Sequence, residues 1–186
     1  TFNDGNPGRA CCYAGDGKFE GKGVEIEISG ELLPRLQVNI GYTLDDSKID
    51  YGSSAGNRIS TNIPKHSFRA WTRYQLPGSL SGLAIGGGVR AQSSFYVSGT
   101  VRTWNPTGGL DGTGAFDGPA VPYDFVEPGR SVWDIFAQYQ LSSAFNLALN
   151  VNNIFDKKYF REVGSTSWGN VYGEPRSFLV TLRGSY

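Results

Sequence analysis

Six side chains in this sequence could hold a bulky, polar ligand. Aromatic faces pack against a ligand's flat or apolar parts, and guanidinium or other polar groups donate hydrogen bonds to its oxygens. They fall in two long polar segments: Tyr96, Arg102, Trp104 and Tyr123 in the first, and Trp168 and Tyr172 in the second. The alternative is that they form an aromatic girdle at an interface or pack the segments together.

A second group recurs at every other position of two predicted strands. Arg69, Trp71 and Arg73 alternate with apolar residues on one strand, and Arg90 does so on the next. Side chains two residues apart share one face of a strand, so these four are predicted to line a polar lumen. There they would either attract an anionic ligand or pair with carboxylates from another part of the protein.

No residue arrangement typical of catalysis or metal binding is present. His66 is the only histidine and has no second His or Cys nearby, which gives neither a catalytic triad nor a zinc site. Glu25 and Glu27 share a strand face and are expected to pair with arginines rather than act as acid and base. The run Gly108–Gly114 lacks the strand-to-helix context of a phosphate loop and is expected to be a flexible loop. We expect no enzyme, no metal site and no cofactor.

The two cysteines, Cys11 and Cys12, are direct neighbours in a segment rich in Gly and Asp. Zinc sites need ligands that are spaced along the chain. A strained vicinal disulfide, pairing with a cysteine outside this chain and a reactive redox pair all stay open.

Seven runs alternate apolar and polar residues as strands do. They are Val24–Ser29, Leu36–Leu44, Phe68–Leu76, Leu83–Gln92, Trp133–Leu141, Phe145–Asn152 and Ser177–Tyr186. The first, third and fifth runs are followed by short turns, such as Glu31–Pro34. The second, fourth and sixth are followed by long polar segments, Asp45–Lys65, Val97–Gly129 and Ile154–Gly173. Alternating short turns and long loops are typical of a membrane β-barrel.

The composition favours the same fold class. No apolar run approaches the roughly 18 residues of a transmembrane helix, while one strand face is apolar and the other carries Arg, Gln, Asn, Ser, Thr and Gly. Aromatic residues near strand ends suit interfacial girdles: Tyr42, Tyr74, Trp133, Tyr139 and Tyr186. With 17 basic and 17 acidic residues, no charge excess attracts nucleic acid. We predict an all-β, antiparallel transmembrane barrel fragment; a soluble β-sandwich is the alternative.

Several motifs resemble TonB-dependent outer-membrane receptors. Asn152–Tyr159, with the sequence NNIFDKKY, is similar to that family's penultimate-strand signature, and Tyr172–Ser177 to the entry into its last strand. Gly23–Leu32 and Ile63–His66 resemble segments of the ferric-siderophore branch, and the match is best with ferripyoverdine and ferric-coprogen receptors. The terminal aromatic Tyr186 is similar to the family's signal to the barrel-assembly machinery.

This resemblance implies a barrel of about 22 strands around a plug, with residues 1–186 as its C-terminal segment. The plug and the N-terminal strands are expected upstream, since the chain has no start Met. The family's function implies capture of a ferric siderophore by outer loops and transport driven by the TonB complex through the plug, in contact with outer-membrane lipids. Iron would be carried within the siderophore. A passive channel, or a receptor for cobalamin, heme or a glycan, is the alternative.

Overall fold

The computed structural model describes residues 2–3, 13–14, 18–50, 55–166 and 168–185. Cys11, Cys12 and Tyr186 lie outside these residues, so their predicted roles stay predictions. Within the described part of the chain, no helix is long and apolar enough to cross a membrane. The one helical segment among the described residues is the 3-10 turn η1, Gly78–Leu80.

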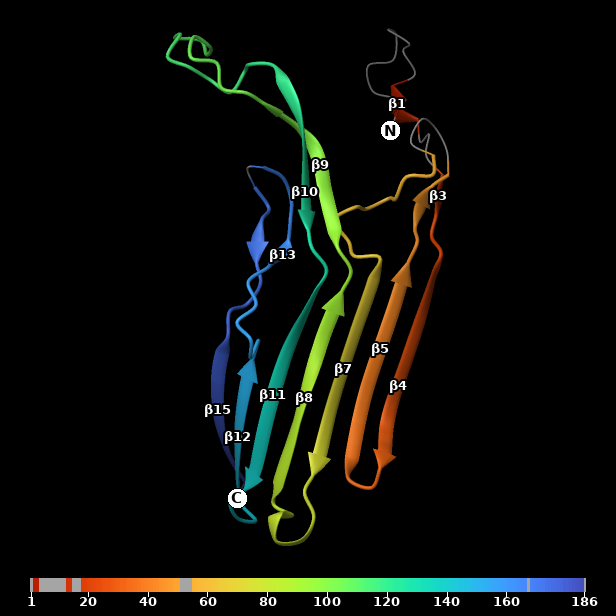
Figure 1. Cartoon of the computed structure of the whole chain (residues 1–186), viewed down its shortest axis with the longest axis vertical. Coiled ribbons are helices and arrows are strands. Elements are labelled where there is room, and N and C mark those ends of the chain that lie inside the picture. Colours follow the sequence, from red (N-terminus) through yellow and green to blue (C-terminus); the bar gives the residue numbers. More distant parts are fainter. Residues whose placement is uncertain (1, 4–12, 15–17, 51–54, 167, 186) are drawn as a thin grey trace.

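A single antiparallel sheet of seven strands forms the body of the structure (Figure 1). Its spatial order is β15-β12-β11-β8-β7-β5-β4, so β4 and β15 are its two edges. The strands are β4 (Gly23–Leu33), β5 (Leu36–Asp45), β7 (His66–Gln75), β8 (Leu83–Gln92), β11 (Arg130–Gln140), β12 (Phe145–Asn152) and β15 (Ser177–Gly184). The seven predicted strands are confirmed, with shifted ends.

The predicted turn Glu31–Pro34 is wrong. β4 continues to Leu33, with a register shift between Glu31 and Leu33, and the reversal takes place at Pro34 and Arg35. Two consecutive leucines break the alternation there, and an extra residue in a bulge restores it. Arg35 has a φ of 71°, and its N–H donates to the Glu31 carboxylate at 2.6 Å.

The register places every apolar run on the same face of the sheet. Ile28 lies opposite Ile40, and Ile40 opposite Ala70 on the next strand. The match continues across the sheet to Leu149 and Val180 on the last two strands. We call this the apolar face and the opposite one the polar face. Both follow from the two-residue period of a strand.

The sheet has a turn end, where short turns join β4 to β5, β7 to β8 and β11 to β12, and a loop end with the long connections (Figure 1). On the apolar face, Tyr42 and Trp133 lie toward the loop end and Tyr74 and Tyr139 toward the turn end. These are the positions of two interfacial girdles.

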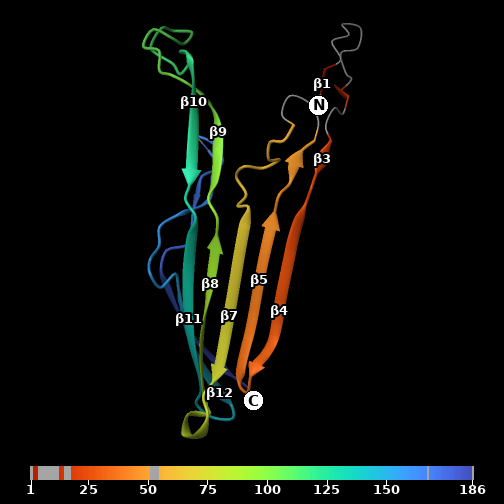
Figure 2. The same ribbon diagram turned by 45° about the vertical axis from the view of Figure 1, so that its right-hand side comes forward.

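The long connections contain strands that the sequence did not reveal. Val97–Gly129, predicted as a polar loop, is largely a hairpin of β9 (Phe95–Arg102) and β10 (Ala120–Glu127), here called the arm. Its β-branched and aromatic residues face each other across the two strands, and such cross-strand pairs stabilise a hairpin. The arm rises beyond the sheet in both views (Figures 1 and 2).

Three short strand pairs complete the loop end. They are β1 (Phe2–Asn3) with β2 (Tyr13–Ala14), β3 (Phe19–Glu20) with β6 (Lys48–Ile49), and β13 (Phe160–Glu162) with β14 (Val171–Tyr172). The last pair lies within the predicted loop Ile154–Gly173 and forms a small flap beside the arm (Figure 1).

Candidate ligand-binding surface at the loop end

The arm divides the predicted ligand-binding residues between its two faces. Tyr123 lies opposite Gly99 and shares a face with Phe125 and Phe95, whereas Tyr96 and Arg102 belong to the other face. Phe95 and Glu127 lie against Arg130, which belongs to the polar face of β11. The Tyr123 face therefore continues the polar face of the sheet, and the six predicted residues do not form one cluster.

Four rings line this continuing face, and we call them the aromatic surface: Tyr123, Phe125, Phe160 and Tyr172. The Phe125 and Phe160 centroids are 5.5 Å apart, edge to face, and Phe160 stacks on Tyr172 at 4.3 Å. Tyr123 lies over Gly99, where a Cβ would approach its ring to 3.0 Å. Tyr172 is 70 % exposed, so its ring can pack against a ligand.

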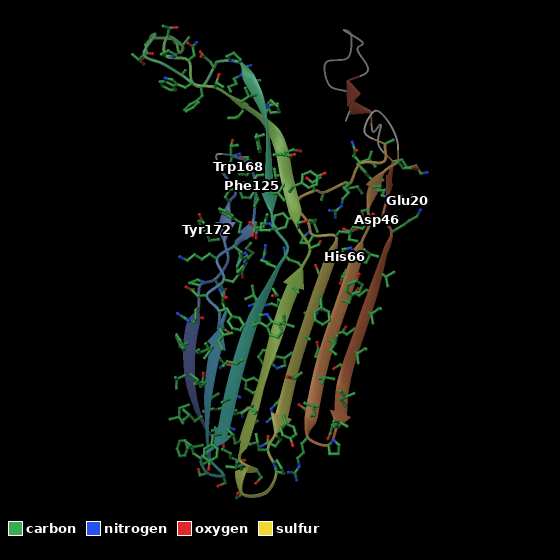
Figure 3. All side chains as sticks on the ribbon, in the orientation of Figure 1. Glu20, Asp46, His66, Phe125, Trp168 and Tyr172 are labelled. Carbon is green, nitrogen blue, oxygen red and sulfur yellow. The ribbon has the colours of Figure 1, made fainter. Side chains whose placement is uncertain are left out.

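Trp168 lies in the turn between β13 and β14, and Figure 3 shows it at the same end of the molecule as Phe125 and Tyr172. Trp168 is 75 % exposed as a residue, while its backbone N–H donates to the Ser165 hydroxyl at 3.2 Å. The turn thus holds the backbone and leaves the indole free to meet a ligand.

Arg102 and Trp104 have structural partners in the tip of the arm. The Arg102 guanidinium donates to the carbonyls of Asp117 and Gly118, at 3.3 and 3.4 Å. Trp104 packs edge to face on Phe116, with centroids 5.1 Å apart. These contacts favour the alternative reading for both residues, namely that they pack the segment itself.

A buried ion pair that was not predicted from the sequence lies beneath the aromatic surface. Arg130 Nη1 lies 3.3 Å from Glu127 Oε1, and the two side chains are 6 % and 7 % exposed. The same Glu127 oxygen accepts the backbone N–H of Phe160 at 3.2 Å. The guanidinium of Arg130 also lies over the Tyr159 ring, 4.3 Å from its centroid. Only the spacing of Glu127 and Arg130 around Pro128-Gly129 signals this pair in the sequence.

The signature motif Asn152–Tyr159 is a structural clamp built on Asn153, which is 2 % exposed. Its amide donates to the carbonyls of Lys157 and Glu174, both at 2.9 Å, and its Oδ1 accepts the Lys157 N–H at 2.8 Å. Its own N–H donates to Asp134 at 2.8 Å. The motif therefore fixes the base of the β13–β14 flap to the end of β12.

Arg69, Trp71, Arg73 and Arg90 lie on the polar face, as the alternation predicts. Trp71 stacks on Phe136 with centroids 5.2 Å apart, and the two rings lie over Gly88 and Gly86, where a Cβ would collide with them. Arg69 is directly opposite Arg90, and Arg90 pairs with Asp134 at 3.1 Å.

The prediction that Glu25 and Glu27 pair with arginines is wrong for the described residues, because neither forms an ion pair there. β4 is an edge strand, and its cross-strand neighbours at these positions are Thr43 and Gly41. The arginines of β7 are one strand further away.

A group of exposed ion pairs surrounds the β3–β6 pair on the other side of the loop end (Figure 3). Lys18 pairs with Asp50 at 2.6 Å and Lys22 with Glu20 at 2.9 Å. Asp46 pairs with both Lys65, at 2.9 Å, and Lys48, at 3.1 Å. Hydrogen bonds from Lys65 and Lys48 lower the pKa of Asp46 below its ordinary value of 3.8.

Two remaining predicted features have local partners. The Tyr42 hydroxyl lies 2.8 Å from His66 Nδ1, on the apolar face near the loop end. In the Gly108–Gly114 run, the Asp111 carboxylate accepts the N–H of Thr113 at 3.2 Å, and Asp117 accepts that of Gly109 at 3.1 Å. Among the described residues, no three His, Cys, Asp or Glu side chains are grouped as a metal site.

Comparison with known proteins gives a consistent picture. A family model described as "TonB dependent receptor-like, beta-barrel" matches residues 3–154. The chain is 34 % identical to the ferric-pyoverdine M114 receptor PbuA of a Pseudomonas strain, over 94 % of this chain and 19 % of that receptor. It is 29 % identical to the catecholate siderophore receptor Fiu of Escherichia coli K12, over 91 % of this chain and 20 % of Fiu.

The solved structures agree with the sequence relatives. The ferripyoverdine receptor of the Pseudomonas aeruginosa outer membrane, solved with ferripyoverdine bound, superposes with a TM-score of 0.75 at 31 % identity, over 97 % of this chain and 21 % of that one. The chain spans about a fifth of the length of the curated relatives it matches.

Proposed function

The chain belongs to the TonB-dependent receptor β-barrel family, and on that premise we propose that it forms C-terminal barrel wall and outer loops of an outer-membrane receptor that imports ferric siderophores. The observation that carries this proposal is the similarity, over nearly the whole chain, to receptors named for ferric pyoverdine. The relatives are named as receptors for ferric pyoverdine or catecholate siderophores. Transport, and not catalysis, is the activity we propose.

The two faces of the sheet support the membrane setting. In hydrocarbon a sheet must present apolar side chains outward and pair its edges, as a closed barrel does. The apolar face would meet outer-membrane lipid and the polar face would line the lumen. The edges β4 and β15 would pair with further strands. The short turns would lie in the periplasm and the arm and the flap outside the cell.

The aromatic surface is the part of the chain we propose to contact the siderophore. Ferric siderophores are bulky chelates with flat and oxygen-rich parts, for which exposed rings are suitable partners. Tyr172, Trp168 and Tyr123 are the predicted residues that the structure supports for this role. Iron enters as cargo within the siderophore, and energy would come from the TonB complex acting through a plug domain.

Uptake of radioactive iron tests the function. An iron-starved strain that lacks the receptor gene is complemented with the intact receptor and given a panel of ferric siderophores, with and without TonB. TonB-dependent uptake of one chelate is expected. Uptake that does not need TonB would favour a passive channel, and uptake of cobalamin, heme or a glycan alone would change the substrate class.

Equilibrium binding of the same chelate tests the site. Replacing Tyr172 or Trp168 with Ala is expected to weaken binding by about tenfold or more, as for an aromatic anchor at an interface. Trp104→Ala is the matched control, because Trp104 packs on Phe116 within the arm. A larger loss for Trp104 than for Tyr172 would move the site to the tip of the arm.

A further inference from the structure

The flap that carries half of the aromatic surface has little strand pairing of its own. β13 and β14 are matched at only two positions, Phe160 with Tyr172 and Glu162 with Val171, with a register irregularity between them. Two-stranded hairpins are marginally stable in water even when longer. Something outside the flap must therefore fix the positions of Phe160 and Tyr172.

The buried residues beneath the flap contact it next to both of these rings. Glu127 accepts the backbone N–H of Phe160 itself. Arg130 lies over Tyr159, the residue before Phe160. The Tyr159 ring in turn fills the space beside Gly173, the residue after Tyr172, and the Gly173 N–H donates to the Tyr159 carbonyl at 2.8 Å.

A buried ion pair adds little net stability to the folded state, because desolvation of both charges opposes their attraction. It can specify geometry, and here one Glu127 oxygen binds both the Arg130 guanidinium and the backbone N–H of Phe160. Glu127 belongs to β10 and Arg130 to β11, so the pair also connects the base of the arm to the sheet. Phe95, at the start of β9, is 2 % exposed beneath the same guanidinium.

We propose that Glu127, Arg130 and Tyr159 form a latch that positions the flap against the arm and so assembles the aromatic surface before ligand binds. These are positioning residues, which act on the ligand through Phe160 and Tyr172. The proposal depends on the proposed function for the nature of the ligand, but the arrangement of the flap can be measured without any ligand.

Distance measurement by electron paramagnetic resonance tests the latch. In the intact receptor, with Cys11 and Cys12 changed to Ser, nitroxide labels are placed at Asp124→Cys on the arm and Thr166→Cys on the flap. We expect a narrow distance distribution that becomes broad in Glu127→Ala and Arg130→Ala. The matched control is Glu162→Gln, because Glu162 is on the same flap, and its pair with Arg161 is 64 % and 56 % exposed. It should leave the distribution narrow.

A second variant keeps the test decisive if the ion-pair variants fail to assemble. Gly173→Ala leaves both charges in place, but its Cβ would collide with the Tyr159 ring. It is expected to broaden the same distribution. Unchanged distributions in Gly173→Ala and in every assembled ion-pair variant would overturn the latch.

Ligand affinity separates positioning from a general structural role. Glu127→Ala should weaken chelate binding by about tenfold, because preorganisation is lost. In a Tyr172→Ala background the same change should cost much less, since the ring it positions is already absent. Additive losses would overturn the positioning role. If no chelate binds the wild type, the proposed function fails, and the distance distributions still decide whether the latch exists.

Discussion

Two regions at the loop end hold their strands by opposite means. Beside the arm, one ion pair is buried among aromatic rings and connects three elements. Around β3 and β6, the ion pairs are largely exposed. Buried pairs cost several kcal/mol when one partner is removed, whereas exposed pairs contribute little and are screened by salt. The first region is thus expected to keep one conformation, whereas the stability of the second is expected to change with salt concentration and pH.

The largest expected difference comes from deleting one carboxylate in each region. Glu127→Ala leaves Arg130 buried without its counter-charge and should lower the free energy of unfolding by about 3 to 5 kcal/mol. Glu20→Ala, whose partner Lys22 is exposed, should leave it unchanged. Guanidinium unfolding of the intact receptor, followed by tryptophan fluorescence, measures both. Equal losses would abolish the distinction between the regions.

The aromatic surface continues the polar face of the sheet, so it is expected on the lumen side. Val38→Arg places a charge on the apolar face and should destabilise the barrel by about 2 to 4 kcal/mol if Val38 lies near mid-membrane. Asn39→Arg, on the polar face beside Trp71, should be tolerated. Unfolding from lipid vesicles measures the difference. The reverse ranking would place the aromatic surface on the lipid side.

A smaller effect is expected from the clamp beneath the flap. Asn153→Ala removes the amide that bonds Lys157 and Glu174 and should cost about 1 to 3 kcal/mol. Asn152→Ala, which loses one exposed hydrogen bond to Ser177, is the control. Hydrogen exchange should accelerate across residues 157–174 in the first variant only. Equal exchange in both would mean that the flap does not depend on Asn153.

The smallest effect belongs to the exposed region and depends on pH. The pKa of Asp46 is lowered by Lys65 and Lys48, so the folded state favours its charged form. That contribution is fully present above the ordinary pKa of 3.8 and is lost as the pH falls through the lower, folded value. Proteolysis of the residue 46–65 loop should rise in that acid range, and earlier in high salt. Asp46→Asn should remove this dependence.

The sequence predicted the sheet because alternation is a local signal. Apolar residues at every other position, such as Val24, Ile26 and Ile28, identify one face of a strand before its partner strand is known. The register of the pairing then aligns these faces. The arm was missed because its strands are separated by residues 103–119 and contain Gly99, Pro122 and polar residues that break the pattern. Its pairing is visible only across the hairpin.

The binding surface was predicted in part for the same reason. Exposed aromatic residues such as Tyr172 and Trp168 can be recognised by type, but the face on which they lie depends on register. Glu127 and Arg130 are only three positions apart, but Tyr159 is 32 positions from Glu127, and no local pattern connects it to the ion pair. Asn153 was recognised within a motif, yet its role rests on a bond to Glu174, on the far side of the flap.

The tip of the arm is closed by its own bonds, since Asn105 and Ala115 exchange two backbone hydrogen bonds and Thr103 bonds Pro119 and Gly118. Beyond them, Leu110 is fully exposed and the chain turns at Gly112. In the proposed orientation this tip lies outside the cell. Substitutions beyond these bonds are therefore expected to leave the strand register of the arm untouched, so the residues at the tip can vary independently of the sheet.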